Sequence, residues 1–162
     1  MKNLSRALPA IALMALLKHA EAQQFLPLGK TIFGVIKAKN PKDVPTKSLS
    51  HGGENIDVFY TKEGGKVGRL AFVQKGVYAP DCTHTWVIGV DPKSAKIASI
   101  DVVEMSCPHA FPTRSKAFLG QFIGKGPADL KKIKKAVHIA KATGSSELTK
   151  DAVIKSITLA EK

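Results

Sequence analysis

Two short cysteine–histidine pairs are the residues of this sequence whose types and spacing could most directly do chemistry. Cys82 pairs with His84, and Cys107 pairs with His109. Residues i and i+2 of an extended segment point the same way, so each pair can present a thiolate and an imidazole together. Two cysteines and two histidines suit tetrahedral zinc or, by a looser analogy, an iron–sulfur cluster of the Rieske type. The even number of cysteines also fits a disulfide between Cys82 and Cys107, which is the preferred interpretation in an exported chain.

A second candidate site is the run of small residues Thr143, Gly144, Ser145 and Ser146. We expect a helix at 145–161, because its apolar residues have helical spacing: Ala152, Val153 and Ile157 form the expected buried stripe. Thr149 is the expected cap, and Asp151 is expected in the first turn. A glycine-containing turn before a helix start offers free N–H groups and a positive dipole end, so this segment can hold a phosphate.

The elements that must position these segments predict an α+β domain. Alternating or β-rich segments predict strands at 31–38, 56–61, 67–74, 83–90 and 97–105, with turns at 63–66 and 91–94. Residues 40–55 and 107–114 are expected to be loops, and a helix is expected at 115–123, ended by Gly124. Residues 136–140 could form a short strand. Strands followed by helices predict one domain, in which C-terminal helices pack on an antiparallel sheet of hairpins.

The first 22 residues have the order of a secretory signal peptide. Lys2 and Arg6 form a positive start, residues 7–17 are apolar, and Ala20-x-Ala22 matches a small-x-small cleavage signal. The apolar run is too short to cross a bilayer as a stable helix. We therefore expect cleavage after Ala22, a working domain of residues 23–162, and a periplasmic or secreted location.

The net charge of the chain limits the classes of partner that we expect. The chain has a net charge of +12, which favours an acidic redox protein, an anionic membrane surface or a phosphorylated ligand. Nucleic acid is not expected as a partner of an exported protein. No catalytic triad, pair of catalytic carboxylates or P-loop is evident, so a hydrolase is not supported. One basic run is either a docking patch for an acidic cytochrome or phospholipid headgroups, or a solvated surface: Lys131, Lys132, Lys134 and Lys135.

The second half of the chain resembles the FMN-binding domain of the exported flavin subunits of the Rnf and sodium-pumping NADH:quinone reductase complexes. The resemblance covers roughly residues 67–157. A hairpin reads WVIGVDPKSAKIASIDVVEMS, and FLGQFIGK and KATGSSELTKDAVIKSI follow after a loop. The family typically shows V-G-I-D, D/P-G-K-I and V-x-V-L-E in such a hairpin, then an F-x-x-Q-F helix and S/T-G-A-T-x-[ST]-S-x-A-V.

This resemblance implies an electron-transfer domain that carries FMN, esterified in the family to the threonine of S-G-A-T by a flavin transferase. Here the acceptor is Thr143 or Ser146, or it has been lost, since neither alignment register keeps the whole motif. His109, Thr113 and Arg114 lie in the loop that matches the family's E-T-P-G-L-G segment, which faces the flavin. We expect an electron carrier or subunit rather than a stand-alone enzyme. The alternatives are a cofactor-free basic interaction subunit of a periplasmic redox complex, and a metal or Fe–S carrier that uses the two C-x-H pairs.

Overall fold

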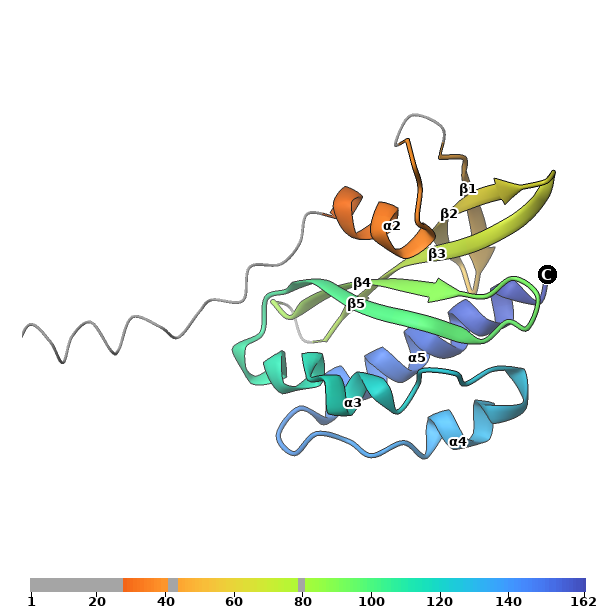
Figure 1. The fold of residues 1–162 in the computed structure, drawn as a ribbon. Coiled ribbons are helices and arrows are strands. Elements are labelled where there is room, and N and C mark those ends of the chain that lie inside the picture. Colours follow the sequence, from red (N-terminus) through yellow and green to blue (C-terminus); the bar gives the residue numbers. More distant parts are fainter. Residues whose placement is uncertain (1–27, 41–43, 79–80) are drawn as a thin grey trace, which may run out of the picture.

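A five-stranded antiparallel sheet forms the centre of the protein in the computed structural model, which describes residues 28–40, 44–78 and 81–162 (Figure 1). The strands follow one another across the sheet in chain order. They are β1 (Thr46–His51), β2 (Glu54–Glu63), β3 (Lys66–Val77), β4 (Thr83–Val90) and β5 (Ile97–Met105). The α+β fold predicted from the sequence is confirmed, and β4 and β5 have the predicted bounds.

Tight turns produce this up-and-down order. Gly52 and Gly53 join β1 to β2 with φ values of 60° and 81°, and Gly64 and Gly65 join β2 to β3 with φ values of 58° and 77°. Two-residue turns with positive φ at both positions match the twist of a hairpin, and glycine adopts them without strain. Asp91 begins the β4–β5 turn, where its carboxylate accepts the backbone N–H groups of residues 93 and 94 at 2.8 and 2.9 Å.

Helices cover both faces of the sheet (Figure 1). On one face lies α2 (Leu28–Ile36), which packs through Ile32 and Ile36 on Ala71, Val73 and Val87. The other face carries the larger core, in which Phe72, Trp86 and Ile88 of the sheet meet Val153 and Ile157 of a long C-terminal helix. The elements on that face are η3 (Pro108–Arg114), α3 (Lys116–Gly120), η4 (Pro127–Asp129), α4 (Leu130–Lys134) and α5 (Thr143–Ala160).

The strand predicted at 31–38 is wrong, because most of this segment belongs to helix α2. Its β-branched residues favour a strand by propensity. The spacing of Ile32 and Ile36, however, places both on one helical face, and both are buried there. Burial of that face against the sheet outweighs the local preference.

Two further local predictions are wrong. The loop expected at 40–55 contains β1, an edge strand whose side chains are mostly exposed and polar, so it lacks the apolar alternation that marks a strand. Residues 136–140 are not a strand. Instead, the Gln121 side chain bonds both the N–H and the carbonyl of Val137, at 3.0 and 3.4 Å, as a neighbouring strand would.

Helix α5 begins two residues earlier than predicted, which changes the role of its polar residues. Thr149 is not its cap but a buried residue inside it, whose hydroxyl donates to the Ser145 carbonyl at 2.8 Å. Asp151 therefore lies beyond the first turn. Ser146 and Ser156 also donate to the carbonyl four residues earlier, at 2.8 and 2.9 Å. These internal bonds satisfy hydroxyl groups that would otherwise be costly to bury.

Candidate functional site

A disulfide joins Cys82 to Cys107, as the sequence predicted. Cys82 directly precedes β4 and Cys107 lies just after β5, and these two strands pair antiparallel with His84 opposite Met105. The start of one strand and the end of the other therefore meet at the same end of the sheet, where the two Cα atoms are 5.0 Å apart.

The metal alternative for Cys82, His84, Cys107 and His109 is wrong. The sulfur atoms are bonded to each other, so neither can act as a thiolate ligand. The two histidines also lie apart. His84 is buried on β4 beneath α5, while His109 is exposed on η3. Within the ranges 28–40, 44–78 and 81–162, no group of three or more His, Cys, Asp or Glu residues could hold a metal ion.

His84 connects the cysteine–histidine segment of β4 with the T-G-S-S segment of α5, two candidate sites that the sequence did not link. Its Nε2 atom lies 3.0 Å from the Ser145 hydroxyl, and its ring stacks on Trp86 with 5.3 Å between the ring centroids. Burial is the main cause that lowers the pKa of His84, so the neutral imidazole is favoured. Sequence reasoning missed this contact because the two residues are 61 positions apart.

The start of α5 exposes one hydroxyl group of the T-G-S-S segment. Thr143 is the first residue of the helix and is exposed, whereas Ser145 is 4% exposed. The Tyr78 ring lies directly against Gly144, and a Cβ at this position would meet Tyr78 Cε2 at 2.3 Å. Glycine therefore lets an aromatic ring cover one side of the helix start, at the residue after Thr143.

Ser146 is fully buried and its hydroxyl is already engaged. The hydroxyl donates to the Ala142 carbonyl at 2.8 Å and accepts the Ile139 N–H at 3.1 Å. It thus holds residues 139–142 against the first turn of α5. Of the two acceptors that the resemblance allows, only Thr143 offers an accessible hydroxyl in this structure.

The segment 107–114, predicted as a loop, folds as the 3-10 helix η3, which contacts α5. Thr113 is buried, and its hydroxyl donates to the Ala110 carbonyl at 2.7 Å. The Arg114 guanidinium lies 5.9 Å from the centroid of the exposed Phe111 ring, and partial burial lowers the pKa of Arg114. Thr113 therefore stabilises η3 internally, while His109 and Arg114 remain accessible to solvent.

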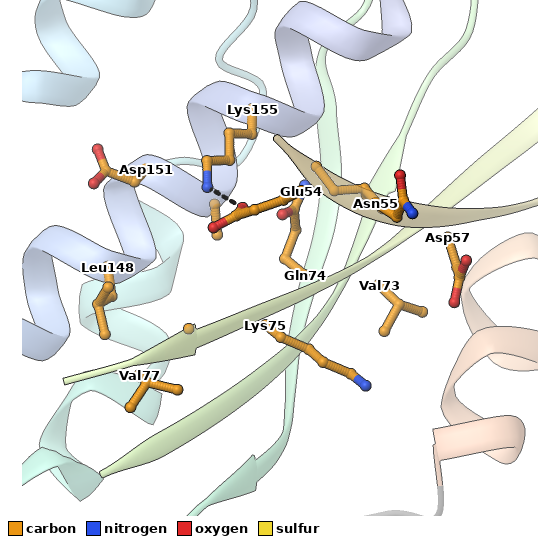
Figure 2. A pocket seen from close by; sticks show the side chains of 13 residues that line it. Glu54, Asn55, Asp57, Val73, Gln74, Lys75, Val77, Leu148, Asp151 and Lys155 are labelled. Atoms are coloured by element: carbon orange, nitrogen blue, oxygen red, sulfur yellow. Dashed lines mark hydrogen bonds and ion pairs between the residues drawn. The ribbon is translucent and has the colours of Figure 1, made fainter. Parts of the chain in front are cut away.

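A hollow of about 580 Å³ lies along the flank of α5 (Figure 2). Strands β2 and β3 form one wall and Leu148 and Asp151 of α5 the other. Across it, Lys155 Nζ pairs with Glu54 Oε2 at 2.5 Å. The buried Gln74 amide donates to the Ser156 hydroxyl, which does not line the hollow, at 3.1 Å. Its volume lies within the range of small-molecule sites. The wall carries both acidic and basic groups, so it does not by itself favour a ligand of one charge.

A buried lysine near the helix start was missed by the sequence analysis. Lys150 is 1% exposed, and its ammonium group lies 2.9 Å from His138 Nε2 and 3.2 Å from Glu147 Oε1. It also donates to the Lys134 carbonyl at 3.3 Å. A hydrogen bond from His138 is the main cause that lowers the pKa of Glu147. This cluster holds the loop before the T-G-S-S segment against α5. Its one signal in the sequence is the spacing of Glu147 and Lys150, which places two opposite charges three residues apart on a helix.

The predicted basic run lies on and just after α4. Ile133 is buried, and the lysines around it are exposed: Lys131, Lys132, Lys134 and Lys135. Lys132 pairs with Asp129 at 3.1 Å. The run is therefore an exposed, charged surface with one buried apolar residue.

Comparisons with models of protein families, with curated protein sequences and with solved structures find no match to this chain. The resemblance to the FMN-binding domain family thus remains a prediction from the motifs.

Proposed function

We propose that this protein is an exported electron-transfer domain that carries one FMN, attached through its phosphate to Thr143. One observation carries the proposal: of the two possible acceptors, Thr143 is exposed at the start of the long helix α5 and Ser146 is buried and bonded. The chain order of hairpin, F-L-G-Q-F segment and T-G-S-S segment supports it as well.

The residues present fit a phosphate ester at Thr143. The first N–H groups of an α-helix have no partner within the helix and its dipole is positive there, so an anion on the Thr143 hydroxyl is stabilised. Tyr78 covers the neighbouring side of Gly144, and His84 and Ser145 hold the helix start on the sheet. FMN supplies the electron-transfer chemistry, and the protein supplies its position and electrostatic surroundings.

Export is the second part of the proposal. The disulfide is compatible with an oxidising compartment outside the cytoplasm. Among the residues that the structure describes, no helix is long and apolar enough to cross a membrane. The signal peptide proposed for residues 1–22 lies outside the described residues.

The exposed lysines of the α4 run are proposed to dock an acidic redox protein or a membrane complex. Charge complementarity raises the rate of encounter and is weakened by salt. Reduction by such a partner should accordingly be fastest at low ionic strength.

A visible spectrum of the protein purified from its native host tests the flavin proposal. A yellow protein with flavin absorbance supports it. A colourless protein that also fails to bind added FMN contradicts it, and so does a wild-type protein that stays non-fluorescent on a denaturing gel after co-expression with a flavin transferase.

The second candidate function is a cofactor-free basic interaction subunit of a redox complex. Its specific support is that Thr113, Ser145 and Ser146 are buried and make internal hydrogen bonds. On this alternative, the T-G-S-S segment is only a helix start, and the colourless outcome above is expected.

A further inference from the structure

A second hollow, which the flavin proposal does not use, lies at the other end of α5. It has a volume of about 450 Å³ and lies between strands β1, β2 and β3 and the last turn of α5, which ends at Ala160. Its lining is mainly apolar: Leu49, Val58, Val67, Leu70, Phe72 and Leu159. Val67 is 41% exposed, so apolar surface of the sheet remains accessible to solvent there. Accessible apolar surface in a concave site of this size is typical of ligand pockets.

The charged side chains that line this pocket have one sign. Lys47, Lys62 and Lys162 line it, and its lining contains no aspartate or glutamate side chain. Lys47 and Lys62 are exposed, and neither has an ion-pair partner within the described part of the chain. The end of a helix carries partial negative charge, so an anion is attracted by the strand lysines rather than by the end of α5.

Both lysines line the pocket from neighbouring strands, at different points along its wall. Lys47 lies opposite Val58, and Tyr60 follows Val58 on the same face of β2. Lys62 comes after a bulge between Thr61 and Lys62 and also lines the pocket. Leu70 lies opposite Tyr60 on β3. The wall of the pocket therefore carries cations and a tyrosine beside an apolar floor.

We propose that this pocket binds a free single-chain amphiphile with an anionic headgroup, such as a fatty-acid carboxylate. The alkyl chain lies on the apolar floor and the carboxylate faces Lys47 and Lys62. The proposal is independent of flavin binding, since neither Thr143 nor any other residue of the T-G-S-S segment lines this pocket.

Calorimetric titration with sodium decanoate, below its micelle concentration and at low salt, tests the proposal. We expect saturable 1:1 binding that tightens about fourfold with each added methylene until the pocket is filled. Decyltrimethylammonium has a cationic headgroup on a chain of the same length, and we expect it to bind at least about tenfold more weakly. Absence of saturable decanoate binding would overturn the proposal, as would equal affinity for the cation.

Two variants and a control separate the contributions of the lysine charges and of the apolar space to binding. The double variant Lys47→Glu/Lys62→Glu should lose at least about tenfold in decanoate affinity. Lys30→Glu/Lys116→Glu makes the same change in net charge at exposed positions that do not line the pocket, and it should bind like the wild type. Val67→Trp should fill the pocket and weaken binding of both amphiphiles, with a melting temperature close to the wild-type value. Equal losses in the two charge variants would show an effect of net charge alone and would overturn the site.

Two other occupants of this surface are outcomes of the same set of measurements. A dimer in sedimentation analysis that Val67→Trp abolishes would show that a second copy of the chain covers it. Binding to anionic lipid vesicles without binding of free decanoate would show a membrane contact. Either result overturns the proposal of a free amphiphile.

Discussion

Removal of the disulfide should destabilise the protein strongly, and the size of the effect follows from its position in the chain. The bond joins residues 25 positions apart. The chain-entropy relation for a loop of this length gives about 3.5 kcal/mol at 25 °C. For a domain of this size that corresponds to a fall in melting temperature of roughly 10 °C. The double variant Cys82→Ala/Cys107→Ala should show this loss, because its unfolded chain is no longer cross-linked.

Urea unfolding followed by tryptophan fluorescence measures the effect, since Trp86 is the single tryptophan and is buried in the core beneath α5. The single variants Cys82→Ala and Cys107→Ala are the matched controls. Each should lose about as much as the double variant, because either change removes the whole cross-link. Wild-type protein treated with a thiol reductant should behave in the same way. A double variant within about 1 kcal/mol of the wild type would refute the reasoning.

Three further predictions concern the buried polar contacts and the basic surface. Because burial lowers the pKa of His84, protons bind more tightly to the unfolded chain, and the free energy of unfolding should fall as pH drops below about 6.5. His84→Gln should flatten this pH dependence in urea titrations at several pH values. An unchanged slope would exclude His84 as its source. Ser156→Ala leaves the buried Gln74 amide without its partner and should cost about 1–3 kcal/mol in urea unfolding. The further change Gln74→Leu should recover part of that loss, and no recovery would contradict the bond's role. Glutamine should replace the four lysines of the basic run: Lys131, Lys132, Lys134 and Lys135. This variant should be reduced more slowly by the partner at low salt, with a nearly unchanged melting temperature. Equal reduction rates in stopped-flow mixing would show that the run is only a solvated surface.

The sequence predicted those parts of the fold in which local pattern and tertiary burial agree. Strands β4 and β5 are rich in β-branched residues and are joined by an Asp-Pro turn, so their bounds could be predicted. Helix α2 could not be predicted from propensity, because its β-branched residues adopt a helix only where Ile32 and Ile36 are buried on the sheet. Strand β1 was missed because an exposed polar edge strand has no apolar alternation.

The candidate site was predictable in its parts but not in its assembly. The pairing of Cys82 with Cys107 follows from an even cysteine count in an exported chain. The contact of His84 with Ser145 joins residues far apart in the chain and has no local signal. The distinction between an exposed Thr143 and a buried Ser146 depends on where α5 begins, and helix starts are the least certain feature of a sequence pattern.

The central claim is tested most directly by the mass of one tryptic peptide after co-expression with a flavin transferase. Cleavage after Lys141 and Lys150 releases residues 142–150, which contain Thr143 and Ser146. We predict that this peptide gains the mass of FMN less one water in the wild type and in the variants Thr143→Ser and Ser146→Ala, and that it is unmodified in Thr143→Val. An unmodified wild-type peptide, or a Thr143→Val peptide that still carries FMN, would contradict the account.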